Sequence, residues 1–374
     1  MIYLDYAATT PLDARVEEAM RPFGRALFAN PSSPHTPGQQ ARAALDRARD
    51  TVAEALGALP EEIVFTSGGT EADNLAIKGA ARARRKQGRH LIATAFEHHA
   101  VLESLAALEA DGFRVTLLAP DTRGLVTAEQ VADALTPETT LVSVMYANNE
   151  IGTIQPVAEI GRLCRARGVL FHTDAVQAAE ELPLDIASLH VDLLSLSAHK
   201  LYGPKGAGVL FVRRGTPLQP LLHGGHQEYE FRAGTENVAG MVGLATALAL
   251  RLDAAEIARI HALRERLIDG LLALPGSRLH GDRIQRLANN VNVGFDGVPG
   301  ETLMVALDLE GIAVSTGAAC AAGAATPSHV VHALGYSLVQ SLEALRITLG
   351  TPTTEADILR TIEAVGGIVA RMRR

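Results

Sequence analysis

A lysine follows directly on an apolar run in the segment Ser197–Lys200 (SAHK). The run Val191–Leu196 predicts a buried strand, so the amine of Lys200 at its end would be partly desolvated. Desolvation lowers the pKa of a lysine and lets the neutral amine form an imine with an aldehyde cofactor. The alternative is an exposed lysine at a strand end, because most lysines stay in solvent.

Asp174 and His98 are candidates for contacts with such a cofactor. Asp174 follows the apolar run Val169–Thr173, and a carboxylate there could pair with a protonated ring nitrogen. Read alone, Asp174 could equally be the N-cap of a helix. His98 follows the run Leu91–Ala95 and could stack on a planar ring and transfer protons near neutral pH. Because the chain has 13 histidines, a structural role for His98 is the alternative.

Two glycines lie between a predicted strand and a predicted helix in Ser67–Glu71 (SGGTE). Their lack of side chains lets a ligand approach the backbone, and the free N–H groups of a helix start favour an anion. The segment therefore indicates a phosphate site. The alternative is a plain strand-to-helix turn capped by Thr70.

The two cysteines differ in their surroundings. Cys164 lies on the apolar side of a predicted helix and is interpreted as packing. Cys320 lies in Ser315–Thr326, a stretch of small residues that predicts a mobile loop. A thiol on such a loop could reach a bound substrate and then move away. A surface cysteine without a role is the alternative.

A metal site is not expected from this sequence. The imidazoles of His223 and His226 (HGGH) have no cysteine or carboxylate partner in their segment, which argues against zinc. A contact with a metal or cluster is conceivable only at Cys320.

Seven short runs rich in Val, Ile, Leu and Phe predict buried strands in the first two-thirds of the chain. The runs are Ile63–Thr66, Leu91–Ala95, Phe113–Leu118, Leu141–Tyr146, Val169–Thr173, Val191–Ser197 and Gly208–Val212. Helical patterns between them cover Glu71–Lys86, Ala100–Ala110, Thr127–Leu135 and Val157–Arg167. This alternation predicts an α/β fold with a mostly parallel seven-stranded sheet flanked by helices.

A change of pattern near Arg251 predicts a second, smaller α+β domain. A long amphipathic helix ends before Pro275, and candidate strands and helices follow at Asn290–Phe295, Glu301–Glu310, Ala344–Leu349 and Glu355–Arg371. We expect residues 15–250 to form a large cofactor-binding domain. Residues 1–14 together with 251–374 would form the small domain, which carries the mobile cysteine loop at about 315–326.

Composition and charge narrow the possible partners. Acidic residues outnumber basic ones by 42 to 34, and the short basic run Arg82–Lys86 is no surface for nucleic acid. The uncharged stretch Val238–Leu250 is shorter than the ~20 residues of a membrane-spanning helix and predicts a buried helix. Two cysteines cannot form a disulfide framework, and Met1–Asp5 lacks a secretory pattern. We expect a cytoplasmic enzyme without nucleic-acid or membrane partners.

The order of these motifs resembles that of the cysteine desulfurases, the NifS/IscS-like group of the class V aminotransferase family, over nearly the whole chain. The matching motifs are Tyr3–Pro11 (YLDYAATTP), Asn30–Ser33 (NPSS), the turn Ser67–Glu71, His98, Asn148–Glu150 (NNE), Asp174–Gln177 (DAVQ), Ser197–Gly206 (SAHKLYGPKG), Arg232–Asn237 (RAGTEN), Cys320 and Arg346. The resemblance implies the fold type I of pyridoxal-phosphate-dependent transferases.

The resemblance also implies roles for single residues. Lys200 would hold pyridoxal 5'-phosphate as an imine, Asp174 would face its pyridine nitrogen, and His98 would stack on the ring and act as acid or base. The other implied contacts are Gln177 to the ring hydroxyl, Gly69, Thr70, Ser197 and His199 to the phosphate, Thr235 of the neighbouring subunit to the same phosphate, and Asn149 and Arg346 to the substrate carboxylate.

The implied reaction converts L-cysteine to L-alanine and leaves the sulfur on Cys320 as a persulfide. The long form of the cysteine loop implies transfer to a scaffold or carrier protein for iron–sulfur cluster assembly or tRNA thiolation, and the role of Thr235 implies a homodimer. A selenocysteine lyase, another class V aminotransferase and an inactive docking dimer for sulfur assembly are the alternatives. Alanines stand at positions 318, 321 and 322, where the family carries hydroxyls.

Overall fold

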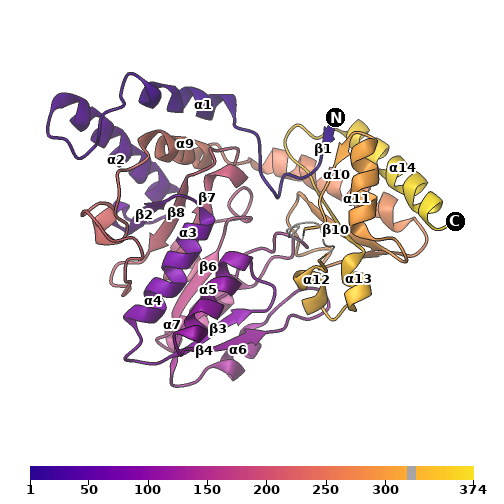
Figure 1. The fold of residues 1–374 in the computed structure, drawn as a ribbon, viewed down its shortest axis with the longest axis horizontal. Helices are drawn as coiled ribbons and strands as arrows, with labels where there is room; N and C mark the ends of the chain where they lie inside the picture. The colour runs from indigo at the N-terminus through magenta and orange to yellow at the C-terminus, as the bar shows by residue number, and fades with distance from the viewer. Residues whose placement is uncertain (318–325) are drawn as a thin grey trace.

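The structure is a computed structural model that describes residues 1–317 and 326–374. Helices pack around a seven-stranded sheet in one part of the molecule, and a smaller part built mostly from the C-terminal third lies beside it (Figure 1). Cys320 and most of the predicted loop around it lie outside the described residues.

The seven predicted runs all form strands of one sheet. In sheet order they are β2 (Ile63–Thr66), β8 (Gly208–Val212), β7 (Leu193–Ser197), β6 (Leu170–Asp174), β5 (Thr139–Ser143), β3 (His90–Thr94) and β4 (Arg114–Leu118). The strands from β7 to β4 are parallel to one another, whereas β8 runs antiparallel to both β2 and β7. The predicted mostly parallel sheet is confirmed.

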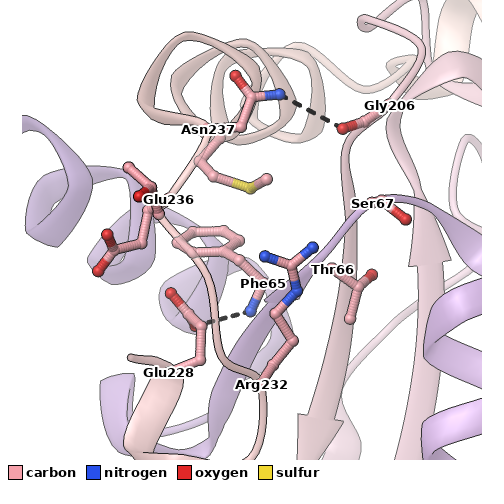
Figure 2. A pocket seen from close by; sticks show the side chains of 10 residues that line it. Phe65, Thr66, Ser67, Gly206, Glu228, Arg232, Glu236 and Asn237 are labelled. Carbon is pink, nitrogen blue, oxygen red and sulfur yellow. Dashed lines mark hydrogen bonds between the residues drawn. The ribbon is translucent and has the colours of Figure 1, made fainter. Parts of the chain in front are cut away.

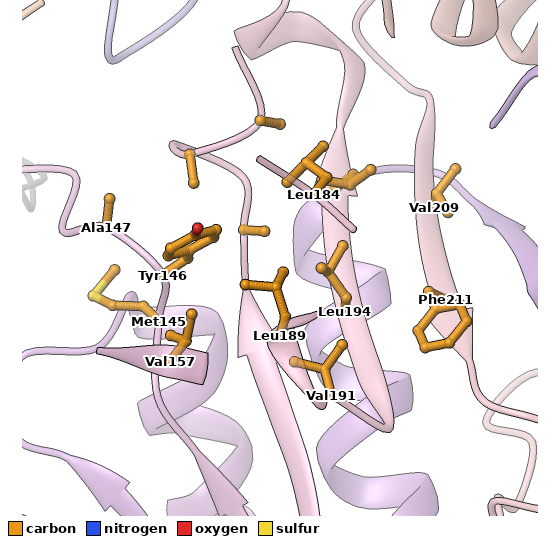
Figure 3. Packing of buried hydrophobic residues seen from close by; sticks show 14 of the residues in the cluster. Met145, Tyr146, Ala147, Val157, Leu184, Leu189, Val191, Leu194, Val209 and Phe211 are labelled. Atoms are coloured by element: carbon orange, nitrogen blue, oxygen red, sulfur yellow. The ribbon is translucent and has the colours of Figure 1, made fainter. Parts of the chain in front are cut away.

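Both faces of this sheet are buried, as the continuous apolar runs require. Successive residues of a strand point to opposite faces. On β7, Leu194 therefore joins one core cluster with Phe211 of β8, and Leu193 joins a second cluster with Leu210. Figure 3 shows Leu194 and Phe211 in the first cluster, with Val157 from a covering helix.

Helices cover both faces. The first cluster receives side chains from α2 (Thr36–Leu56), α6 (Ala128–Ala134), α7 (Val157–Ala166), α8 (Ile186–Leu189) and α9 (Val238–Ala249). The second receives them from α3 (Gly69–Asn74), the π-helix Leu75–Gly79, α4 (Ala80–Ala83) and α5 (His99–Ala110). The helices predicted between the strands and the buried helix after Asn237 are confirmed, with some ends shifted by a few residues.

The first two helices, α1 (Ala14–Met20) and α2, were not predicted from the sequence. Many of the buried positions of α2 are alanines, among them Ala41, Ala44 and Ala48. Alanine contributes little apolar area, so the hydrophobic pattern of this helix is weak although its residues favour helix.

The smaller part is built on an antiparallel sheet in the order β12-β10-β9. Its strands are β9 (Ser277–Leu279), β10 (Asn290–Phe295) and β12 (Ala344–Thr348), and α10 (Ala254–Leu272), α11 (Gly300–Leu309) and α14 (Glu355–Met372) share its core. The strands and helices predicted here are present. The sequence did not predict the short elements β9, β11 (Ile312–Ala313), α12 (His329–Ala333) and α13 (Leu338–Leu342).

The N-terminal strand β1 (Ile2–Tyr3) pairs in parallel with β11, and Leu4 is buried in the core of the smaller part. The chain then crosses to the large sheet, where the N–H of Thr10 donates to the carbonyl of His199 at 2.9 Å. The first ten residues thus bridge the two parts. The domain boundaries at residues 14 and 250 stay a prediction.

Within the residues that the structure describes, no single helix has the length and the apolar composition to cross a membrane. Only α9 and α10 taken together pass that test, and an 80° bend separates them.

A buried ion pair ties α2 to a strained turn. Glu228, Tyr229 and Glu230 have φ values of 45°, 57° and 67°, a region that residues other than glycine rarely adopt. The carboxylate of Glu228 accepts hydrogen bonds from both terminal nitrogens of Arg49 at 2.8 and 2.7 Å. It also accepts the N–H of Phe65 at 2.8 Å (Figure 2). These contacts hold the turn against β2.

We expect Glu228→Gln to lower the free energy of unfolding by about 3–5 kcal/mol, because the buried guanidinium of Arg49 loses its counter-ion. Chemical denaturation measures the loss. Asp46→Asn is the control on α2, since Asp46 pairs with Arg42 in an exposed contact worth less than about 1 kcal/mol. Equal losses in the two variants would contradict a role for the buried pair.

Candidate active site

A cavity of about 360 Å³ lies at the carboxyl edge of the parallel strands. Asp174 is the last residue of β6 and Ser197 the last residue of β7, so the pairing of these strands brings both side chains to the same edge. Ten of the predicted site residues line the cavity: Gly69, Thr70, His98, Asn149, Asp174, Gln177, Ser197, His199, Lys200 and Arg346.

Lys200 ends a short 3-10 helix (Ala198–Lys200) that follows β7. Its Nζ donates to the carbonyl of Ala8 at 2.7 Å and to the carbonyl of Ala7. Burial, together with the positive charge of Arg346, lowers the pKa of Lys200 to about 8, although the charges of Asp5 and Asp174 act in the opposite direction. The amine is therefore partly neutral near physiological pH, as a nucleophilic lysine requires.

Asp174 lies buried at the end of β6. Burial raises the pKa of its carboxyl, while the charges of His98 and Lys200 and the N–H of Val176 oppose that rise. The N–H of Val176 donates to Oδ1 at 2.9 Å, but the residues after Asp174 form a turn and not a helix. The helix N-cap alternative for Asp174 is therefore wrong.

His98 stands at the N-terminus of α5, where its Nδ1 accepts the N–H of Ala100 at 3.1 Å. This contact leaves the ring proton of the neutral imidazole on Nε2. Burial lowers the pKa of His98, although the charge of Asp174 acts in the opposite direction. A neutral imidazole in the cavity can give or take one proton.

The glycine turn opens into a second, shallower cavity, which is lined by Ser67 to Glu71, Ser197, His199, Lys205 and Gly206. Helix α3 starts at Gly69 with Gly68 as its N-cap and no side-chain cap, so the alternative in which Thr70 caps the turn is wrong. A Cβ atom on Gly69 would lie 2.9 Å from a methyl carbon of Val176, so a larger residue there would force the Val176 side chain or the turn to shift. The free N–H groups and hydroxyls of this turn suit an anion.

Arg346 lies on β12 and is buried. One terminal nitrogen donates to Asp5 at 2.8 Å, and the other donates to the backbone carbonyl of Asn149 at 3.1 Å. Its Nε is buried without a hydrogen-bond partner among the described residues. The guanidinium thus faces the cavity with donor capacity for a further anion.

Thr235 does not line the cavity of Lys200. It lines a cavity of about 240 Å³ that shares Ser67 and Gly206 with the cavity of the glycine turn. Figure 2 shows Ser67, Gly206 and Arg232 around this cavity. Cys320 lies outside the described residues. Cys164 is fully buried on α7 and burial raises the pKa of its thiol to about 12, which agrees with a packing role.

No group of three or more His, Cys, Asp or Glu side chains among residues 1–317 and 326–374 is arranged to hold a metal ion. His226 instead contacts Glu230 at 2.9 Å on the surface.

The family model for aminotransferase class-V matches residues 2–360. This chain belongs to the aminotransferase class-V family. It is 48% identical to the cysteine desulfurase IscS of Methanosarcina thermophila over 100% of this chain and 93% of that protein. It is 46% identical to the putative cysteine desulfurase IscS 1 of Bacillus subtilis over 99% of each chain. The predicted resemblance is confirmed.

Solved structures agree with this membership. A NifS-like protein superposes with a TM-score of 0.92 at 37% identity and 99% coverage of both chains. A structure of SspA in complex with cysteine superposes with a TM-score of 0.85 at 38% identity, over 93% of this chain and 99% of that one. The predicted fold class is therefore confirmed as well.

Sequence reasoning missed several acidic residues of this member of the aminotransferase class-V family. Asp5 pairs with Arg346, and Asp73 lines the cavity. Glu97 and Glu150 are buried behind it, and Glu150 accepts the hydroxyl of Ser328 at 2.5 Å. Asp5 and Glu150 stand inside matching motifs, but nothing in a single sequence marks an acidic residue as buried or paired.

The pKa of Glu97 predicts a pH-dependent stability. Burial raises this pKa to about 8, although Oε1 accepts the hydroxyl of Thr94 at 2.6 Å and the N–H of Met145 at 2.9 Å. Between the unfolded pKa of about 4.3 and about 8, the folded state holds a proton that the unfolded state has lost. This contribution to stability is complete below that window and is lost by about 1.4 kcal/mol per pH unit as pH rises through it.

We expect Glu97→Gln to remove this contribution, because the amide keeps the acceptor oxygen and has no proton to lose. Melting temperatures recorded from pH 5 to pH 8 should fall less steeply in the variant. Glu103→Gln, on the exposed side of α5, serves as the control and should keep the slope of the parent protein. Identical slopes for Glu97→Gln and the parent would count against a protonated Glu97.

Proposed function

We propose that this protein is a pyridoxal-phosphate-dependent cysteine desulfurase, which converts L-cysteine to L-alanine and transfers the sulfur to Cys320. The observation that carries the proposal is a single cavity in which Lys200, with its lowered pKa, lies with Asp174, His98 and Arg346. Relatives named cysteine desulfurase match the whole chain, and a structural neighbour is described with cysteine bound.

The side chains of the cavity fit pyridoxal phosphate. Lys200 would hold the aldehyde carbon, and Asp174 at the end of β6 would pair with the ring nitrogen. The hydroxyls of Thr70 and Ser197 and the N–H groups that begin α3 would take the phosphate, together with His199. When bound, the cofactor supplies an electron sink for the α-carbon of the substrate.

His199 and Gln177 support this assignment through their protein contacts. Burial lowers the pKa of His199 to about 4, so its imidazole is neutral, and Nδ1 lies 3.2 Å from the hydroxyl of Thr9. The amide of Gln177 donates to the carbonyl of Ala7 at 3.0 Å, which holds its side chain at the cavity. We propose that the Gln177 side chain also reaches the ring hydroxyl.

Other residues of the cavity would bind the substrate and transfer protons. Arg346 and Asn149 would bind the substrate carboxylate, which orients the α-carbon toward Lys200. The neutral amine of Lys200 would take the α-proton. His98 would exchange a proton with the substrate thiol through Nε2, because Nδ1 is occupied by the N–H of Ala100.

The sulfur step uses the thiolate of Cys320 as nucleophile. An S–S bond forms between Cys320 and the substrate sulfur while the substrate Cβ–Sγ bond breaks. The electron pair of that bond stays with the carbon skeleton, which takes up a proton and leaves as alanine. The persulfide on Cys320 would then pass its outer sulfur to a scaffold or carrier protein for iron–sulfur cluster assembly or tRNA thiolation, in a reducing cytoplasm that keeps the thiol free.

Three variants should separate these roles. Lys200→Ala is expected to lose the visible band of covalently held cofactor and to form no alanine. Cys320→Ser should keep the band and lose sulfur transfer to an acceptor. Arg346→Gln should keep the band and raise KM for cysteine by about tenfold or more, since a charged hydrogen bond contributes about 1.5–3 kcal/mol. Absorbance measures the cofactor band, alanine release measures turnover and KM, and labelled sulfur recovered on an acceptor protein measures the transfer.

Cys164→Ala is the matched control, because this thiol is buried on α7 and has no part in the proposed chemistry. Formation of pyruvate in place of alanine, or undiminished sulfur transfer by Cys320→Ser, would contradict the proposed function.

We also propose a closed homodimer. Thr235 lines a cavity that is separate from that of Lys200, and its proposed phosphate contact belongs to the partner subunit's site. A groove of about 330 Å³ between α2 and α9, lined by apolar side chains such as Phe23 and Val242, offers area for such a contact. Sedimentation should give twice the 39.5 kDa of one chain, and an active monomer would contradict the assembly.

A further inference from the structure

A second carboxyl group, Asp73, lines the same cavity as Asp174. It stands on α3, one turn after the glycine turn, and the residue is 1% exposed. The reaction proposed above gives Asp73 no role. Two carboxyl groups in one buried cavity cannot both be ionised at low cost, because like charges repel strongly where water is excluded.

No positively charged side chain lies against Asp73 among the contacts that the structure describes. Its Oδ1 lies 3.6 Å from Nε2 of His172 and has no hydrogen-bond partner among the described residues. His172 is hydrogen-bonded on both ring nitrogens, to the hydroxyl of Ser143 at 2.8 Å and to the hydroxyl of Ser195 at 3.0 Å. Burial lowers the pKa of His172 to about 3, so it offers no positive charge.

Asp174 has a different environment. A backbone N–H donates to its Oδ1, and His98 and Lys200 both act to lower its pKa. For Asp73, burial raises the pKa most, the charges of Asp174 and Glu97 raise it further, and only the hydroxyl of Ser195 opposes them. The two environments therefore separate the pKa values of the carboxyl groups of Asp73 and Asp174, which favours a proton on Asp73.

We propose that Asp73 is a positioning residue that keeps a proton at the floor of the cavity and leaves Asp174 as its single anionic carboxyl. The inference rests on the proposed function in one respect, the pairing of Asp174 with the ring nitrogen. With a neutral Asp73, the pair of Asp174 and the ring nitrogen has no net charge in the cavity. An ionised Asp73 would add a second buried anion with no cation beside it.

The titratable groups that face Asp73 are Asp174 and His172 on β6 and Glu97 after β3. Two of the three are acids and the third is neutral, so none of them favours ionisation of Asp73. The same proton would be retained in the holoenzyme, because burial, the largest cause of the raised pKa of Asp73, remains when Asp174 pairs with the ring nitrogen.

Infrared difference spectroscopy of the holoenzyme near pH 7 tests the proposal. A protonated carboxyl has a C=O band separate from carboxylate bands. We expect the parent spectrum to contain such a band that is missing in Asp73→Asn, a neutral variant of the same shape. Asp185→Asn is the control: Asp185 caps α8 at the surface and hydrogen bonds from Ser188 lower its pKa, so no C=O band should be lost.

The visible cofactor band supplies a second measurement on the same proteins. The pH at which the imine between Lys200 and the cofactor is half protonated should stay the same when a neutral group is removed. It should fall by about one unit or more when a nearby anion is removed. An unchanged C=O region in Asp73→Asn together with a lowered midpoint would overturn the proposal. If Asp73→Asn does not fold, Ser195→Ala replaces it. Loss of the Ser195 hydroxyl, which hydrogen-bonds to Asp73, should shift the frequency of the C=O band. An unshifted band would contradict its assignment to a protonated Asp73.

Asp174→Asn distinguishes this inference from the proposed function. If that variant keeps the cofactor band and its pH midpoint, the pairing of Asp174 with the ring nitrogen fails. The C=O band assigned to Asp73 would still decide the location of the proton.

Discussion

The parallel pairing of β6 with β7 is the constraint on which the site depends. Parallel strands end at one edge of the sheet, so Asp174 and Ser197 are brought together by backbone hydrogen bonds and not by contacts of their own. The short 3-10 helix after β7 then turns Lys200 back over that edge. Because the strands are buried on both faces, their ends cannot slip without exposing Leu193 or Leu194, and the geometry of the cavity is fixed by the core.

Exclusion of water from this edge sets the charges of the site. Burial lowers the pKa of Lys200 to about 8 and that of His199 to about 4, and it raises the pKa of Asp174. The N-terminal segment contributes to this exclusion, because the carbonyls of Ala7 and Ala8 accept hydrogen bonds from the amine of Lys200. Burial thus lowers the pKa of the amine of Lys200 and raises the pKa values of the carboxyl groups of Asp174 and Asp73.

Much of the fold was predictable because it follows from local patterns. Each of the seven apolar runs became a strand, since a run of β-branched and aromatic residues between turn signals fits a buried strand and little else. The alanine-rich helix α2 was missed, because alanines give little hydrophobic contrast. Asp73 lines the cavity but was not predicted, since its importance comes from His172 and Ser195, which are distant in sequence. Asp5 stands in a matching motif, but its pairing with Arg346 was not predicted for the same reason.

The sequence by itself determined which residues can do chemistry and the order in which strands and helices present them, because residue type and periodicity are local properties. The tertiary structure alone decided the charges. Whether Lys200 is neutral, whether Arg346 has a counter-ion and which carboxyl keeps a proton all depend on burial and on partners from other elements. Those quantities come from distances across the fold, which a linear pattern does not contain.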